Sequence, residues 1–146
     1  MRVEDRMTKD PVTVRADQTV KAAAELMRTH SIRHLPVVDT QDNLVGLLTD
    51  RDIRQVRFAP AMRTRLAEEP SLLDQLRVGE VMSSPVVTTA PLDDLADAAT
   101  TMYERKIGAL PVVLQGHVVG IISEVDILKA FAEMTGREPQ AAPDDW

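Results

Sequence analysis

Two short stretches of this chain each contain a hydroxyl residue and an aspartate that could bind a polar ligand, and the spacing of the two residues is the same in both stretches. Thr49 is followed three residues later by Asp52, and Ser123 is followed three residues later by Asp126. Each stretch comes directly after a glycine and two aliphatic residues, and each is predicted to open a helix. A hydroxyl and a carboxylate so spaced at a helix N-terminus have two interpretations.

The first interpretation is a capping box. In this arrangement the hydroxyl accepts a hydrogen bond from the backbone N–H three residues on, and the carboxylate accepts one from the backbone N–H of the hydroxyl residue. The second interpretation is a nucleoside site. Free N–H groups and the helix dipole attract negative charge, and a carboxylate beside them can accept hydrogen bonds from both hydroxyls of a ribose. The occurrence of the pattern twice favours the nucleoside site.

The residues that lead to the first motif are predicted to form a pair of strands. Residues 32–39 favour extended structure because they contain the β-branched pair Val37-Val38. Residues 41–43 are polar and predict a turn, and residues 44–48 are the returning strand. A helix is expected to follow from Asp50.

A strand and a helix are predicted upstream of this pair. Val12, Thr13 and the residue after them favour a short strand, and Asp17 is a plausible cap for the helix that follows. Apolar residues then recur at i, i+3, i+4 and i+7, which indicates one buried helix face. These residues are Val20, Ala23, Ala24 and Met27.

The same pattern occurs a second time. A shift of 75 residues places the apolar helix face on Leu95, Ala98, Ala99 and Met102. Beyond a turn at residues 115–117 that is one residue shorter, the shift becomes 74 and Gly46 falls on Gly120. Agreement across helix, strands and turn identifies an internal repeat.

The repeat divides the chain into four parts. Residues 1–59 form the first repeat, residues 60–77 a helical connector, residues 78–135 the second repeat and residues 136–146 a mobile tail. The predicted fold class is α/β (α+β), with two β-α-β-β-α repeats packed sheet to sheet with pseudo-two-fold symmetry around one shared core. Such packing creates clefts at the seam. Trp146 is either a stray apolar residue or a docking contact.

The connector has no counterpart later in the chain. Its leucines lie among charged residues and predict one or two short amphipathic helices, broken at Pro70, with Ser71 capping the second.

Composition excludes several classes of protein. The absence of cysteine excludes disulfides and thiolate chemistry. Residues 1–77 carry a net charge of +1 and residues 78–146 a net charge of −7, so a nucleic-acid backbone is a poor partner. No apolar run is long enough to span a membrane, and residues 1–5 lack a signal-peptide core. We therefore expect a cytoplasmic protein with neither a nucleic-acid nor a membrane partner.

Catalytic and metal-binding motifs are not evident. His30, His34 and His117 do not have metal-ligand spacing, and Ser83 and Ser84 lack the context of a nucleophile. Phosphate-binding glycine motifs are absent as well. We expect no enzyme activity, no metal and no required cofactor.

The residues also resemble a known family. The runs Met-Thr-x-x-Pro-Val-Thr-Val from Met7, Ile-Arg-His-Leu-Pro-Val-Val-Asp from Ile32 and Leu-Val-Gly-Leu-Leu-Thr-Asp-Arg-Asp-Ile from Leu44 are similar to tandem cystathionine-β-synthase (CBS) domains, which form a Bateman module. The resemblance covers residues 3–57 and 78–132. It implies a regulatory module that binds AMP, ADP, ATP or S-adenosylmethionine in its clefts, forms a homodimer and regulates another protein.

The resemblance also implies crossed pairing between the repeats. Residues of the first repeat would complete the Ser123/Asp126 cleft, namely Val12, Thr13, Ile32, Arg33 and His34. Residues of the second repeat would complete the Thr49/Asp52 cleft, namely Val87, Thr88, Lys106 and Ile107.

The two clefts differ in charge under this pairing. Arg33 and His34 offer a guanidinium fork and a titratable donor for a phosphate, whereas the matching residues 108 and 109 are glycine and alanine. Lys106 can supply one charge to the poorer cleft. The Ser123/Asp126 cleft is therefore predicted to bind nucleotide more strongly. The other interpretation of Arg33 and His34 is an exposed strand start.

Adenine is expected to contact aliphatic side chains and backbone, because no aromatic residue falls in the motif strands. A second hypothesis from a different class is a dimerisation scaffold with vestigial clefts. In that case the helices near Ala22 and Ala96, and those after Ile53 and Ile127, would form the dimer face. Stabilisation by a nucleotide separates the two hypotheses.

Overall fold

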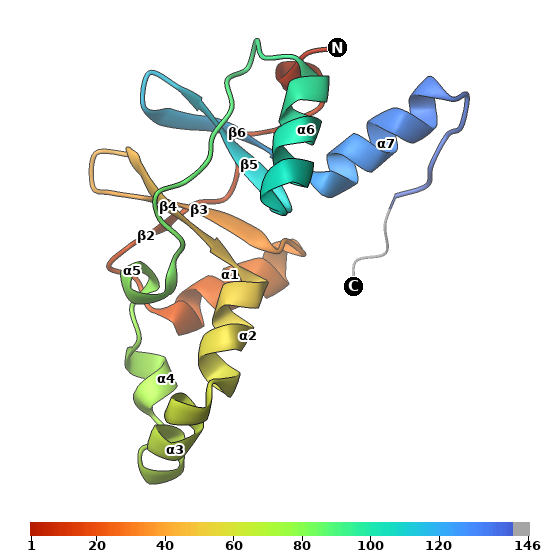
Figure 1. Ribbon diagram of the computed structural model, residues 1–146. Helices are drawn as coiled ribbons and strands as arrows, with labels where there is room; N and C mark the ends of the chain where they lie inside the picture. The colour runs from red at the N-terminus through yellow and green to blue at the C-terminus, as the bar shows by residue number, and fades with distance from the viewer. Residues whose placement is uncertain (142–146) are drawn as a thin grey trace. The chain divides into compact units, whose positions relative to one another are not determined.

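The computed structural model describes residues 1–141, and the chain divides into two compact units (Figure 1). The first-repeat unit comprises residues 12–86. The second-repeat unit comprises residues 1–11 and the chain from residue 87 onward. Both units combine a three-stranded sheet with helices, so the predicted mixed α/β class is confirmed.

The first-repeat unit has strand order β2-β3-β4, with β2 parallel to β3 and β3 antiparallel to β4. One helix lies between β2 and β3 in the chain, and the other four follow β4. The elements are β2 (Val14–Arg15), α1 (Val20–His30), β3 (His34–Val38), β4 (Leu44–Thr49), α2 (Asp50–Phe58), α3 (Pro60–Glu68), α4 (Leu72–Gln75) and α5 (Val78–Val81).

The second-repeat unit has strand order β1-β6-β5, and both of its strand pairs are antiparallel. The elements are the 3₁₀ helix η1 (Val3–Asp5), β1 (Thr8–Lys9), α6 (Leu95–Arg105), β5 (Ala109–Leu114), β6 (His117–Ser123) and α7 (Glu124–Met134).

The predicted apolar faces of α1 and α6 point into the cores. On α1 the side chains of Val20, Ala23 and Met27 are buried, and Ala24 is half-buried. The predicted cap of this helix is wrong, because the Thr19 hydroxyl accepts from the Ala22 N–H at 3.1 Å. The matching residues Leu95, Ala98 and Met102 are buried on α6, and Ala99 is half-buried.

The two strand pairs share one irregularity and differ in their turns. A register shift falls between Val37 and Val38 in β3 and at the matching place in β5. In the first turn the Asp39 carboxylate accepts from the backbone N–H groups of Gln41 and Asn43. In the second, two residues with positive φ, Gln115 at 53° and Gly116 at 83°, close the hairpin as in a type I′ turn. This tighter turn accounts for the missing residue.

The repeats exchange their first segments. Thr8 of the first repeat pairs with Ile121 of β6, and Ser83 of the second repeat exchanges two backbone hydrogen bonds with Leu47 of β4. Because of this exchange each unit completes a core of its own. Buried side chains form one cluster in each unit, and the predicted packing of the two repeats around a shared core stays a prediction.

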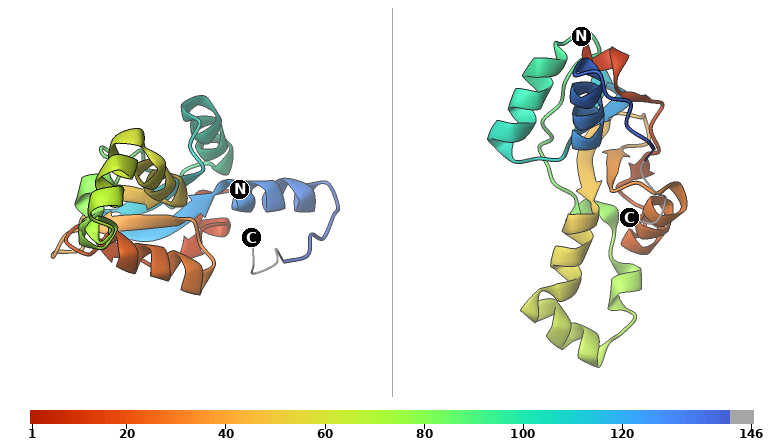
Figure 2. Two further views of the ribbon diagram at one scale, coloured as in Figure 1. Left: turned by 90° about the horizontal axis from the view of Figure 1, so that it is seen from below. Right: turned by 90° about the vertical axis from the view of Figure 1, so that its right-hand side faces the viewer.

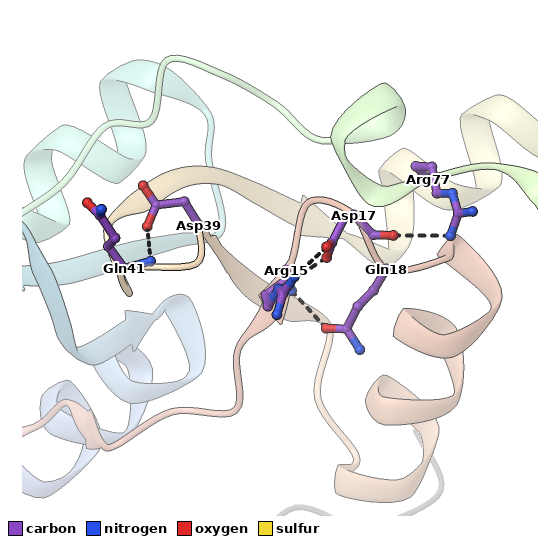
Figure 3. A network of polar contacts seen from close by, with 6 residues as sticks. All are labelled: Arg15, Asp17, Gln18, Asp39, Gln41 and Arg77. Atoms are coloured by element: carbon purple, nitrogen blue, oxygen red, sulfur yellow. Dashed lines mark hydrogen bonds and ion pairs between the residues drawn. The ribbon is translucent and has the colours of Figure 1, made fainter.

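The connector forms the two predicted helices, α3 and α4, which extend from the end of α2 (Figure 2). Ser71 holds the N-cap position of α4, but its side chain makes no capping hydrogen bond. Beyond α4, the Arg77 guanidinium donates to the Asp17 carbonyl oxygen at 3.1 Å (Figure 3). Asp17 also pairs with Arg15, which explains why it is not the cap of α1. Trp146 lies outside the described residues.

Candidate functional site

The Thr49 motif forms the start of α2. The Asp52 backbone N–H donates to Thr49 Oγ1 at 3.0 Å, and the Thr49 backbone N–H donates to Asp52 Oδ2 at 3.0 Å. These reciprocal bonds satisfy two of the N–H groups that have no partner within the helix. The capping-box interpretation is therefore confirmed for this motif.

The Ser123 motif forms the start of α7 in the same way. The Ser123 backbone N–H donates to Asp126 Oδ2 at 2.8 Å, and the Asp126 backbone N–H approaches Ser123 Oγ at 3.4 Å. The Ser123 hydroxyl also donates to Asp126 Oδ2 at 3.0 Å. Asp126 Oδ2 thus accepts both bonds that Ser123 donates, one from its backbone N–H and one from its hydroxyl.

The second oxygen of each carboxylate has different surroundings. Asp52 Oδ1 accepts from the Ser83 hydroxyl at 3.5 Å. Within residues 1–141, no donor within hydrogen-bonding distance faces Asp126 Oδ1. Both aspartates are partly exposed, and each lies in the first turn of its helix. A polar ligand with two hydroxyls fits this chemistry.

Each motif adjoins the strand start of its own repeat. The Asp50 N–H donates to the Arg33 carbonyl oxygen at 3.0 Å, and His34 is the cross-strand partner of Thr49. In the second-repeat unit the Glu124 N–H donates to the Gly108 carbonyl oxygen at 2.9 Å, and the residue after Gly108 pairs with Ser123. The strand starts and the motifs are therefore fixed to each other by backbone bonds.

The remaining predicted residues lie in the same two units. Val12 and Ile32 are half-buried against the first core, and Thr13 is exposed. Val87 and Ile107 hold the matching half-buried positions in the second unit. Thr88 and Lys106 are exposed there, and Lys106 ends α6 in the left-handed conformation at φ 54°.

Each unit thus brings together one motif and the strand-start residues of the same repeat. The crossed pairing of the two repeats stays a prediction. Sequence reasoning did not select Ser83 as a site residue, although it matches Thr8 across the repeat and contacts Asp52. The shift of 75 residues between the repeats aligns Ser83 with Thr8, and this alignment could have identified Ser83 from the sequence.

Comparison with known proteins decides the family. The model of the CBS domain matches residues 3–58 and again residues 78–133. The chain belongs to the CBS domain family. The two CBS matches coincide with the two repeats, and each ends in a helix that begins at a capping box.

Several CBS proteins resemble the whole chain. It is 39% identical over 125 residues to the CBS domain-containing protein YhcV of Bacillus subtilis, covering 86% of this chain and 81% of that protein. The CBS domain pair of protein MJ0100, solved with 5′-methylthioadenosine and S-adenosylmethionine, is 28% identical with a TM-score of 0.75. CBSX2, solved with AMP, is 28% identical with a TM-score of 0.76. Each of these structures covers 92% of this chain, which covers 98% of each.

Other CBS relatives are longer enzymes. A homoserine O-acetyltransferase of Methanococcus vannielii is 35% identical over 126 residues, and the match takes up 24% of its length. Only the CBS portion of that enzyme is therefore similar to this chain.

Within residues 1–141, every helix is too short or too polar to cross a membrane.

Proposed function

We propose that this CBS pair is a regulatory module that binds an adenosine nucleotide (AMP, ADP or ATP, with S-adenosylmethionine as a further candidate) and relays its occupancy to a partner protein. It works as a homodimer, and it carries no catalytic group of its own. Support comes from the two related CBS pairs that were solved with AMP and with S-adenosylmethionine and 5′-methylthioadenosine.

The observation that carries the proposal is the Asp126 carboxylate, of which one oxygen accepts the hydrogen bonds of the capping box. Asp126 Oδ2 accepts the capping bonds, while Oδ1 is available to ribose hydroxyls at a helix N-terminus. Because the box fixes the carboxylate, little side-chain entropy is lost when a ribose binds. Capping and nucleoside binding are therefore compatible roles of one residue.

Thermal unfolding with added nucleotide tests the proposal. AMP, ADP, ATP and S-adenosylmethionine are each added at about 1 mM, and a ligand at 100 times its dissociation constant adds about 2.7 kcal/mol. For a domain of this size the midpoint then rises by several degrees. If none of the four ligands raises the midpoint, the proposal fails and the scaffold hypothesis replaces it.

Asp126→Asn separates binding from capping. The amide oxygen still accepts the Ser123 N–H, so the ligand-free midpoint is expected to stay close to that of the parent protein. The amide nitrogen replaces an acceptor with a donor, so nucleotide affinity is expected to fall about tenfold or more. Asp50→Asn, one residue into α2 and outside both boxes, is the matched control.

We propose that the Ser123/Asp126 motif binds more strongly than the Thr49/Asp52 motif. Asp52 Oδ1 is already contacted by Ser83, so a ribose would compete with that hydroxyl. Calorimetric titration of Asp126→Asn and Asp52→Asn checks the order, and a greater loss of affinity in Asp52→Asn would reverse it.

The crossed pairing is tested through Arg33. Its guanidinium is proposed to contact the phosphate of the nucleotide, as are His34 and, in the poorer cleft, Lys106. If Arg33 contacts a nucleotide bound at the Asp126 motif, Arg33→Ala weakens nucleotide binding in the Asp52→Asn background. The same substitution then has little effect in the Asp126→Asn background. The opposite result would assign Arg33 to the motif of its own repeat, beside which its carbonyl lies.

A further inference from the structure

Two of the seven methionines of this chain lie at matching positions of the two repeats. The shift of 75 residues places Met7 on Met82. Met7 packs against the core of the second-repeat unit, and Met82 packs against the core of the first-repeat unit. Both residues are half-buried, so solvent reaches part of each one while the rest contacts a core.

Each methionine sulfur fills the space beside a glycine in which another residue would carry its side chain. A Cβ added at Gly120 would lie 2.5 Å from the Met7 sulfur and 3.0 Å from the Met7 Cγ. The Met82 sulfur lies closer still to the matching position at Gly46. Such separations are shorter than van der Waals contact, so each sulfur can lie there only because its neighbour is glycine. An atom added to either sulfur on the glycine side therefore has no room.

The other five methionines have different surroundings. Met27 and Met102 are only 6% and 5% exposed, whereas Met1 and Met134 are 51% and 70% exposed. Met62 lies on the connector helix α3 and belongs to neither core cluster. Access to solvent and contact with a core are thus combined at the two matching methionines.

We propose that Met7 and Met82 are modification sites, at which oxidation by a peroxide loosens the attachment of the exchanged segment to its sheet. The thioether sulfur attacks one oxygen of the peroxide, the O–O bond breaks and an S–O bond forms. Sulfur loses two electrons and becomes a sulfoxide, and hydrogen peroxide is reduced to water. Because the chain has no cysteine, thiols do not compete for the oxidant.

A sulfoxide does not fit where the thioether lies. Oxidation converts a flexible apolar side chain into a polar and chiral one. Holding the new oxygen against the apolar core is unfavourable, because a polar group is then removed from water. Turning the oxygen toward the glycine is blocked by the close approach of the sulfur. The oxidised side chain must therefore turn toward solvent, which removes its contacts with the core.

Each methionine directly precedes the residue that joins its segment to a sheet. Thr8 pairs with Ile121 of β6. Ser83 exchanges two backbone hydrogen bonds with Leu47, and its hydroxyl donates to Asp52 Oδ1. Oxidation is therefore expected to weaken one of these pairings in each unit. An effect on nucleotide binding rests on the proposed function, whereas the loss of stability does not.

Peroxide treatment followed by thermal unfolding tests the proposal. The protein is treated with increasing concentrations of hydrogen peroxide, and peptide mass spectrometry follows oxidation at each methionine. The unfolding midpoint is expected to fall by about 5 °C or more as Met7 and Met82 are oxidised. A constant midpoint after full oxidation of both residues would overturn the proposal. Failure of both to react under conditions that oxidise Met1 and Met134 would overturn it as well.

Leucine substitutions assign the effect to particular residues. Leucine is close to methionine in volume and carries no sulfur. Met7→Leu with Met82→Leu is expected to keep its midpoint after peroxide treatment. Met1→Leu with Met134→Leu is the matched control and is expected to lose as much as the parent protein. A smaller loss in this control would assign the effect to the exposed methionines and refute the proposal, even if the first variant does not fold.

Hydrogen exchange locates the change within the molecule. In oxidised Met82→Leu, protection is expected to fall in β6 and to persist in β4, and in oxidised Met7→Leu the reverse is expected. A uniform fall in both variants would contradict the proposed sites. A methionine sulfoxide reductase with a dithiol reductant, which removes the oxygen as water, is expected to restore protection.

Nucleotide-induced thermal shifts are recorded before and after oxidation. If the unoxidised protein shows no shift, the proposed function fails while the oxidation sites are still judged by the midpoint and by hydrogen exchange. If the unoxidised protein shows a shift and oxidation leaves both the midpoint and protection unchanged, the oxidation sites fail and the proposed function stands.

Discussion

At the residue scale, two glycines that match across the repeat each lie under a methionine. A Cβ added at Gly120 would lie 2.5 Å from the Met7 sulfur and 3.0 Å from the Thr8 carbonyl oxygen. At Gly46 the Met82 sulfur is closer still, and the Ser83 carbonyl oxygen would be 3.2 Å away. The glycine that precedes each motif is therefore required by the close approach of the exchanged segment, rather than by a turn.

Gly120→Ala is expected to destabilise the protein by about 1–3 kcal/mol, because the Thr8 carbonyl belongs to the backbone and cannot rotate away. Urea denaturation measures the change. Adding Met7→Ala to this variant is expected to recover only part of the loss. Gly79→Ala is the control, since its nearest neighbour is the Ala16 carbonyl oxygen at 3.3 Å. An equal loss at Gly79 would contradict this explanation.

At the element scale, helix faces were easier to predict than helix starts. The apolar spacing located α1 and α6 because one side of each helix must be buried whatever its neighbours are. Asp17 and Thr19 are both good capping residues, and the sequence does not rank them. Thr19 directly precedes the helix and its hydroxyl accepts from the Ala22 N–H, whereas the Asp17 carboxylate pairs with Arg15.

Thr19→Ala is expected to lower the stability by about 1 kcal/mol, the usual cost of losing an N-cap. Asp17→Ala removes an exposed ion pair, which contributes between about 0 and 1 kcal/mol. The two variants are compared by thermal or urea unfolding. If Asp17→Ala were the more damaging substitution, Asp17 would contribute more to the start of α1 than its contacts indicate.

At the scale of the whole molecule, the first nine residues belong structurally with the second repeat. Val3 is fully buried in the cluster that contains Leu95 and Leu110, and Thr8 extends the sheet beside β6. Removal of residues 1–9 therefore opens the core of the second-repeat unit and leaves the core of residues 12–86 complete.

Hydrogen exchange in a chain lacking residues 1–9 measures this asymmetry. Protection is expected to fall in β6 and α6 and to persist in β3 and β4, because the second unit loses a strand and the buried Val3. Val3→Ala in the full chain is a milder version and is expected to change protection in the same elements. A uniform fall across both units would indicate that they unfold as one.

The sequence by itself determined the repeat, the helix–strand–strand–helix order within each repeat, the hairpins and the two Thr/Ser-x-x-Asp motifs. All of these depend on contacts within a few residues or on the periodic burial of side chains. Both can be recognised from the order of residue types along the chain. The motif residues were found for the same reason, since a capping box joins residues only three positions apart.

Only the tertiary structure decided which segments complete which sheet. The pairings of Thr8 with Ile121 and of Ser83 with Leu47 join residues far apart in the chain. Segments this short have no periodic pattern from which the partner strand could be predicted. The contact of Ser83 with Asp52 and the cluster of buried residues within each unit follow from that exchange. Local pattern fixes the elements, whereas the choice among equivalent strand partners depends on the packing of the complete fold.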